Sequence, residues 1–161
     1  MTDPVRIRSA TPADVPLILG LIRELAEYEK MLPQVTASEA DLRNSLFGPK
    51  PAAECVIAEQ DSRPAGFALF FHNFSTFLGK PGLYLEDLYV KPELRGKGIG
   101  RRLLSHLARL TLERGCGRFE WAVLSWNEPA IRIYQRLGAQ MLDDWRINRL
   151  TGAALEKLAA G

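Results

Sequence analysis

The residues best suited to chemistry lie in one glycine-rich stretch, Val90 to Arg102, with the sequence VKPELRGKGIGRR. Three glycines (96, 98 and 100) alternate there with cationic side chains, between a strand-like run and a helix-like run. Such a turn points several backbone N–H groups at one spot, leaves the approach open, and places an anion at a helix N-terminus. The stretch therefore predicts a cradle for a diphosphate.

The glycine spacing narrows the kind of diphosphate site. The P-loop pattern G-x-x-x-x-G-K-[ST] is missing, and where the dinucleotide fingerprint needs G-x-G-x-x-G this chain reads G-x-G-x-G. The pattern that fits is R-x-x-G-x-G, formed by Arg95, Gly98 and Gly100. The alternative interpretation is a flexible turn with a basic surface, but three glycines cost backbone entropy that a plain turn would not require.

Two acids and a tyrosine are the candidates for moving protons. Glu86 and Asp87 are neighbours in the strand-like run before the glycine turn. Because side chains alternate along a strand, we expect them on opposite faces, with only one of them in a given cleft. Tyr134 follows Ile131 and Ile133 in an apolar run. The pattern alone leaves open that the acids are ordinary surface residues and that Tyr134 packs in the core.

The elements that position these residues can be predicted from hydrophobic periodicity and from turn and capping residues. We expect strands at about 5–9, 54–59, 65–74, 83–90, 118–124 and 146–150, and a loop at 75–82. We expect helices at about 11–28, 38–47, 98–114 and 127–137, and a last helix from 152. This order favours one α+β domain over 1–161, with a core at about 5–150, a C-terminal arm at about 146–160, and a sheet with helices on both faces.

Composition limits the function classes. The 161 residues are 47% hydrophobic and 25% charged, with a net charge of +2, values typical of a globular protein and without a basic run that would suggest nucleic acid. Two isolated cysteines suggest a reducing compartment, and two histidines without C-x-x-C give no metal-site pattern. No signal peptide or membrane-spanning run is recognisable, so we expect a cytoplasmic protein.

The motifs resemble the GNAT superfamily of N-acetyltransferases, whose acetyl-CoA pyrophosphate loop contains R-x-x-G-x-G. Three further stretches resemble its spermidine/spermine and thialysine branch, and the similarity covers about residues 5 to 158. They are 22–30 (IRELAEYEK), 84–87 (YLED), and 126–129 (WNEP) with the following Tyr134 and 137–139 (LGA). The resemblance implies a GNAT fold with a mixed, mostly antiparallel sheet, a direct transfer from acetyl-CoA to a primary amine, and no metal.

The resemblance also implies the roles of individual residues. Glu86 matches the carboxylate that accepts the amine's proton, and Tyr134 matches the tyrosine that protonates the leaving sulfur; a tyrosine pKa of about 10 suits a thiol of about 8.5. Asp87 is expected to have a supporting role. Lys97, Arg101 and Arg102 could meet phosphate charges. The expected cofactor-binding residues are Leu88, Tyr89, Val90, Arg95, Gly96, Lys97, Gly98, Ile99, Gly100, Arg101, Asn127, Glu128, Pro129 and Ala130.

The acceptor is less well defined by the motifs. Residues matching substrate-facing positions of the branch are Tyr28, Glu29, Ser75, Phe77, Glu86 and Asp87. Polyamine acetyltransferases have an acid where Ser75 stands, and losing that charge weakens the attraction of a polycation, so we expect a lysine-like amino acid or a diamine. A polyamine acetyltransferase, a protein-amine acetyltransferase and a non-catalytic acetyl-CoA-binding module remain alternatives. The branch also implies a homodimer, and no nucleic acid or membrane partner is expected.

Overall fold

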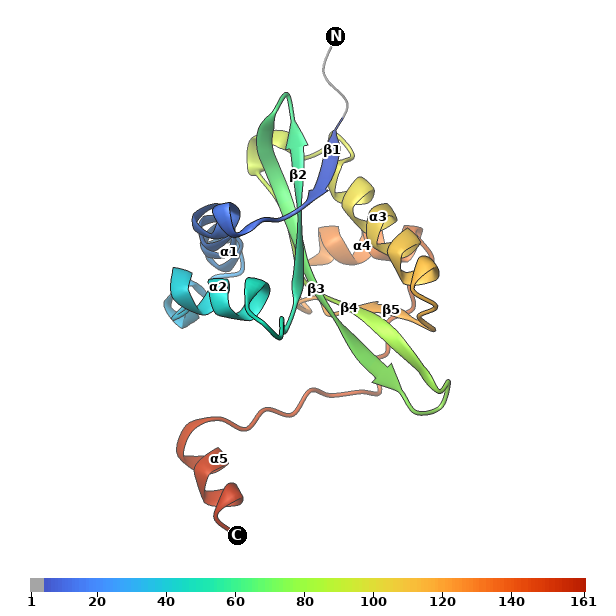
Figure 1. The fold of residues 1–161 in the computed structure, drawn as a ribbon. Coiled ribbons are helices and arrows are strands. Elements are labelled where there is room, and N and C mark those ends of the chain that lie inside the picture. The colour runs from blue at the N-terminus through green and yellow to red at the C-terminus, as the bar shows by residue number, and fades with distance from the viewer. Residues whose placement is uncertain (1–4) are drawn as a thin grey trace. The chain divides into compact units, whose positions relative to one another are not determined.

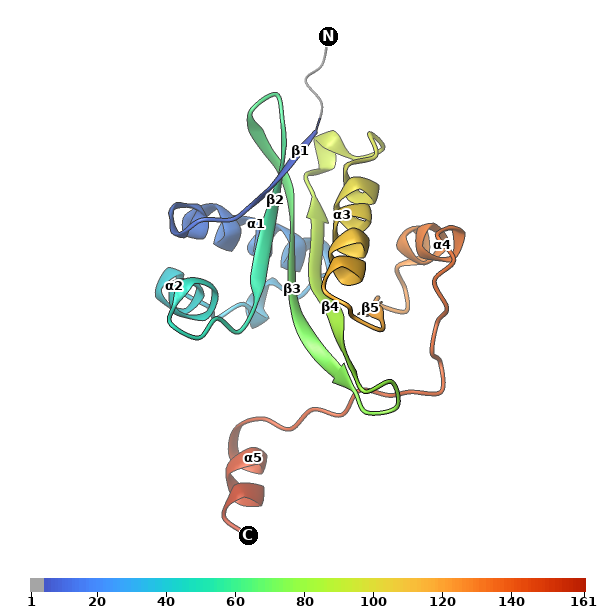
Figure 2. The same ribbon diagram turned by 45° about the vertical axis from the view of Figure 1, so that its right-hand side comes forward.

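The computed structural model describes residues 5–161 (Figures 1 and 2). The described chain forms two compact units, the first ending at Ala122 and the second beginning at Val123. The prediction of one domain over 1–161 also includes residues 1–4, which lie outside the described residues, and it stays a prediction. Within 5–161, no helix is both long enough and apolar enough to cross a bilayer.

The first unit is built on a mixed five-stranded sheet with the order β1-β2-β3-β4-β5. Antiparallel pairs join β1 (Arg6–Ser9), β2 (Glu54–Gln60), β3 (Arg63–Ser75) and β4 (Lys80–Val90), and β5 (Phe119–Trp121) runs parallel to β4. In Figure 2, α1 (Val15–Tyr28) and α2 (Glu39–Phe47) cover one face of this sheet and α3 (Ile99–Glu113) covers the other. The predicted α+β fold, a mostly antiparallel sheet with helices on both faces, is confirmed.

Capping residues set the starts of the first two helices. Thr11 opens a capping box with Asp14, and the first turn, η1 (Pro12–Asp14), is a 3₁₀ turn that leads into α1. Ser38 does the same for α2: its hydroxyl accepts from the Asp41 N–H at 3.1 Å, and its own N–H donates to the Asp41 carboxylate at 2.8 Å. Two further 3₁₀ turns are η2 (Leu32–Gln34) and η3 (Pro92–Leu94).

The face under α1 and α2 contains the main apolar core. Its buried side chains come from the inner faces of α1, α2 and three strands, and they include Ile18, Leu21, Leu46, Ile57, Phe67 and Tyr89. Arg8 of β1 closes the edge of this core with ion pairs to Asp14 at 2.8 Å and Glu59 at 2.7 Å. On the opposite face, α3 buries Ile99, Leu103, Leu104 and Leu107.

The structure corrects two boundaries in the first unit. The expected loop at 75–82 is shorter, since β3 runs to Ser75 and β4 begins at Lys80, which leaves a turn at 76–79. The Ser75 hydroxyl accepts from the Leu78 N–H at 3.2 Å and stabilises this turn. The expected strand at 118–124 is shorter, since β5 covers only Phe119–Trp121.

The second unit contains α4 (Glu128–Arg136) and α5 (Gly152–Ala159). Asn127 is the N-cap of α4, and its side chain accepts from the Ala130 N–H at 3.4 Å, as predicted for this position. The prediction of a strand at 146–150 was wrong: this segment is irregular. Its apolar residues, Ile147 and Leu150, are exposed, so neither has the buried, hydrogen-bonded neighbour that a strand requires.

Candidate active site

The glycine turn has the geometry expected of an anion cradle. Gly96 and Gly98 adopt positive φ values of 77° and 79°, which glycine adopts without steric cost, and Gly98 is the N-cap of α3. Within the described residues, a Cβ at either position would have no neighbouring atom within 4 Å. In the same part of the chain no side chain caps α3, and its first helical bond runs from Arg102 N–H to the Gly98 carbonyl at 3.0 Å. The N–H groups of residues 99–101 are therefore available to a diphosphate.

The edge of β4 beyond β5 is the second element of the site. The register of β4 with β5 ends at Leu85 and Trp121, while β4 continues along β3 to Val90. The Lys91 N–H donates to Ala65 of the β3 side at 2.9 Å. Because backbone groups alternate along a strand, those of Tyr89 also face β3, and those of Leu88 and Val90 face the other edge. Of the three expected backbone contacts, this geometry can offer Leu88 and the Val90 N–H to a ligand, whereas the Val90 carbonyl already accepts from Arg95 Nε at 2.9 Å.

A β-bulge lies where β5 ends. Leu69 pairs with Asp87, but the next residue, Phe70, pairs with Leu85, so Glu86 is an extra residue in β4. Glu86 is exposed, and Asp87 is half-buried on the face that α1 covers, opposite Leu69. The regular alternation of side chains, from which we expected Glu86 and Asp87 on opposite faces, is therefore interrupted at this bulge.

Three carboxylates of the first unit, those of Glu29, Glu86 and Asp87, form an acid cluster. Burial, with the charges of Glu86 and Glu29 added, raises the pKa of Asp87 to about 6. Burial also raises the pKa of Glu29, the residue that follows the end of α1. The Asp87 pKa is thus raised by burial and by negative neighbours, and the Glu29 pKa by burial. The arrangement favours a positively charged group as a ligand, since a cation would lower the cost of burying these charges.

The remaining predicted acceptor residues lie in two places. Tyr28 ends α1 and is 40% exposed, with the Arg95 guanidinium 4.9 Å from the centre of its ring. Ser75 and Phe77 lie at the β3–β4 turn, away from the bulge along the strand. There Ser75 is 8% exposed with its hydroxyl occupied by the turn, and Phe77 is 95% exposed. The structure brings Tyr28, Glu29, Glu86 and Asp87 into one region, and it leaves Ser75 and Phe77 outside it.

Tyr134 and the second cofactor segment belong to the second unit. Asn127, Glu128, Pro129 and Ala130 form the N-terminal cap and first turn of α4, and Tyr134 lies near the end of the same helix. Tyr134 is half-buried, and Ile131 is the buried residue of this helix. Their roles in cofactor binding and catalysis stay predictions.

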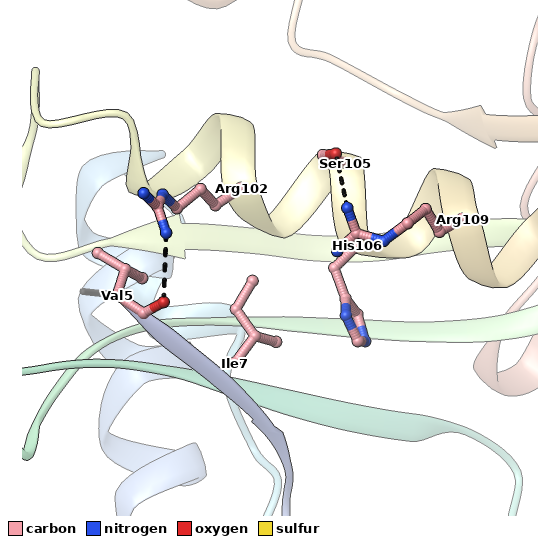
Figure 3. A pocket seen from close by; sticks show the side chains of 6 residues that line it. All are labelled: Val5, Ile7, Arg102, Ser105, His106 and Arg109. Atoms are coloured by element: carbon pink, nitrogen blue, oxygen red, sulfur yellow. Dashed lines mark hydrogen bonds between the residues drawn. The ribbon is translucent and has the colours of Figure 1, made fainter.

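A separate basic pocket lies between β1 and α3 (Figure 3). It is lined by Val5, Ile7, Arg102, Ser105, His106 and Arg109. In Figure 3 the Arg102 guanidinium points toward β1, where it donates to the Val5 carbonyl at 3.4 Å. The side chain of Arg102, one of the three cations expected to meet phosphate charges, is therefore directed at the start of β1.

The comparison with protein families decides what kind of site this is. The model of the acetyltransferase (GNAT) family matches residues 22–139, which include the acid cluster, the bulge, the glycine turn and Tyr134. The chain belongs to the GNAT family. Relatives that are similar over nearly the whole chain are N-acetyltransferases, so this GNAT protein is an N-acetyltransferase enzyme.

Individual relatives and structures agree with this assignment. The GNAT chain is 43% identical to a thialysine N-epsilon-acetyltransferase of Bos taurus, over 96% of this chain and 97% of that protein. It is 33% identical to an L-ornithine N5-acetyltransferase of Arabidopsis thaliana, over 95% and 87% of the two chains. Among solved structures, an integron cassette protein of V. cholerae matches with a TM-score of 0.81 and 30% identity, over 98% of each chain.

Sequence reasoning missed two features of the GNAT site. The bulge at Glu86 has no signal in LYLEDLYV, because an extra residue in one strand shows only when the partner strand is known. The direction of the Arg95 side chain was also missed. Tyr28 is distant from Arg95 in the sequence, and Tyr89 belongs to a strand whose pattern gives no sign of this contact. Only the fold brings the two rings to the Arg95 guanidinium.

Proposed function

We propose that this enzyme transfers the acetyl group of acetyl-CoA to the side-chain amine of a small, lysine-like amino acid. The names of two relatives support this acceptor class, since one acts on thialysine and one on L-ornithine, both amino acids with a side-chain amine. The glycine turn supports the donor, because its open approach and uncapped helix N-terminus suit the diphosphate of acetyl-CoA.

The observation that carries the proposal is the half-buried Asp87, on which the charges of Glu86 and Glu29 act. An aliphatic amine has a pKa near 10.4 and arrives as a cation, so Asp87 and Glu29 would attract and orient it. The same amine must lose a proton before it can attack. We assign proton removal to Glu86, directly or through water, because it lies at the bulge and is exposed enough to pass the proton to solvent.

Acetyl-CoA supplies, when bound, an acetyl thioester that the neutral amine attacks directly. The N–H groups of Ile99, Gly100 and Arg101 would hold its diphosphate, with Lys97 adding charge, and Leu88 and Val90 would pair with its amides as an added strand would. Asn127 to Ala130, at the start of α4, are the further cofactor contacts that we propose. The Tyr134 hydroxyl would donate a proton to the leaving sulfur.

Acetylation of a polyamine is the second candidate. Three carboxylates in one region suit an acceptor with several positive charges. A spermidine/spermine N(1)-acetyltransferase-like protein of Homo sapiens is 35% identical over 98% of this chain, although the match covers 24% of that protein. Against this candidate, Ser75 contributes no charge at the β3–β4 turn.

The test is thiol release from acetyl-CoA with a panel of acceptors: thialysine, lysine, ornithine, putrescine, spermidine, spermine and a lysine peptide. We expect the highest kcat/KM for thialysine, lysine or ornithine. A clear preference for spermidine or spermine would favour the second candidate, and a preference for the peptide would reject both. If acetyl-CoA binds but no amine is acetylated, the protein is a binding module and the proposal is wrong.

We also propose a cytoplasmic homodimer. Apolar side chains of the C-terminal arm, including Ile147 at 79% and Leu158 at 71% exposure, are the surface that a second copy would cover. Cys55 and Cys116 are both free thiols, which fits a reducing cytoplasm. Size-exclusion chromatography with light scattering should give twice the chain mass of 18.0 kDa, and a species of 18.0 kDa would reject the dimer.

A further inference from the structure

Arg95 is the first residue of R-x-x-G-x-G, and its side chain turns toward the α1 side of the sheet. Its Nε–H donates to the Val90 carbonyl at 2.9 Å. Its guanidinium carbon lies 4.9 Å from the centre of the Tyr28 ring and 5.4 Å from that of Tyr89. Tyr89 belongs to the core that α1 covers, whereas α3 packs on the other face (Figure 2). The guanidinium therefore makes cation–π contacts with both aromatic rings.

These contacts connect three parts of the candidate site. The Val90 carbonyl belongs to the edge of β4, Arg95 itself begins the glycine turn, and Tyr28 ends α1. An arginine suits this position because its flat guanidinium can stack on rings while its Nε–H stays directed at a carbonyl. A ligand for phosphate would not need either ring.

The end of α1 also places an acid. Glu29 follows Tyr28 directly, and its N–H donates to the Leu25 carbonyl at 2.9 Å, so the two residues share one turn of helix. The Glu29 charge acts on Asp87, which places the two carboxylates near each other. Holding the Tyr28 ring therefore also holds the Glu29 carboxylate at the acid cluster.

We propose that Arg95 is a positioning residue for the acceptor amine, which fixes Tyr28 and Glu29 beside Asp87, and that its side chain is not a phosphate ligand. This inference rests on the proposed function, because it assigns the acid cluster to the amine. It separates two roles within one turn: the backbone of residues 96–101 receives the donor, and the side chain of residue 95 organises the acceptor region.

The two roles predict opposite kinetic effects for Arg95→Gln. We expect the KM for the best amine, measured at saturating acetyl-CoA, to rise about tenfold, with the Kd of acetyl-CoA changed less than about threefold. Arg95→Lys keeps the charge and loses the flat face and the Nε–H, so we expect an amine KM between those of wild type and Arg95→Gln. The matched control is Lys97→Gln, which removes a charge from the same turn and should weaken acetyl-CoA more than the amine. A tenfold weaker Kd for acetyl-CoA in Arg95→Gln, with the amine KM unchanged, would overturn the proposal.

A second measurement does not depend on turnover. Hydrogen exchange of the amides of Glu29, Lys30 and Met31, which bond to carbonyls of α1, reports on the end of this helix. We expect faster exchange there in Arg95→Gln and wild-type exchange in Lys97→Gln. Unchanged exchange in Arg95→Gln would reject the positioning role. If the wild-type enzyme acetylates none of the amines, the proposed function fails by itself, and the exchange result still decides the role of Arg95.

Discussion

Replacing Asp87 by asparagine should make the folded protein more stable and the enzyme less active. Burial and neighbouring charges raise the Asp87 pKa from 3.8 to about 6. A carboxyl group with a raised pKa in the folded state costs stability wherever it must ionise. Since one pKa unit corresponds to about 1.4 kcal/mol, the ionised Asp87 costs the folded state about 3 kcal/mol at pH 7. An asparagine keeps the shape and removes that cost.

The pH dependence gives the sign of this effect. Well below pH 3.8, Asp87 is protonated in both the folded and the unfolded state, so it contributes no difference. As the pH rises from the unfolded pKa of 3.8 through the folded pKa of about 6, the wild type should lose stability that Asp87→Asn keeps. Urea unfolding followed by circular dichroism should therefore show the variant more stable by up to about 3 kcal/mol at pH 7, with little difference at pH 4.

Glu86→Gln is the control for this measurement. Glu86 is the exposed neighbour of Asp87, so its substitution should change the free energy of unfolding by about 0.5 kcal/mol or less. The reasoning is refuted if Asp87→Asn is no more stable than the wild type at pH 7, or if its advantage is the same at pH 4. A higher KM for the amine in Asp87→Asn would show that the wild type gives up stability for function.

Three other perturbations test separate parts of the structure. Gly98→Asp should abolish acetyl-CoA binding in calorimetry, because it adds a negative charge above the cradle, whereas Gly98→Ala should retain binding and cost about 1 kcal/mol of stability from its positive φ; binding by the aspartate variant would mean that the turn is not the diphosphate site. Tyr134→Phe should lower kcat by about 100-fold with the Kd of acetyl-CoA unchanged, and an unchanged kcat would remove its acid role. Asp14→Asn should lower the free energy of unfolding in urea by about 2 kcal/mol at pH 7, because Arg8 lowers the Asp14 pKa to about 2. This stability is present above pH 4 and is lost as the pH falls toward 2. An equal loss at pH 2 would contradict the ion-pair explanation.

Local signals in the sequence predicted most elements of the fold. Capping residues such as Thr11 and Ser38 identify helix starts, and the apolar run at 54–59 identifies β2, because these signals act within a few residues. The strand predicted at 146–150 failed for the opposite reason. An apolar pattern becomes a strand only when another strand pairs with it, and the sequence of a segment does not show its partner.

The same distinction applies to the candidate site. The glycines and Asn127 were predictable because a positive φ or an N-cap selects a residue type directly. The bulge at Glu86, the half-buried state of Asp87 and the stacking of Arg95 on Tyr28 depend on long-range contacts. Motif matching therefore predicted the conformation of the glycine turn, but it could not show on which face of the sheet an individual charged side chain lies.

The open edge of β4 has a consequence for how acceptor preference can change. A ligand that pairs with Leu88 and Val90 is recognised by main-chain groups, which every residue except proline provides. Most substitutions there leave the hydrogen-bonding pattern intact. The acid cluster is built from side chains, so one codon change at Glu29 or Asp87 alters its charge. We therefore expect related proteins to differ in the amine that they accept more readily than in the donor that pairs with the main chain of β4.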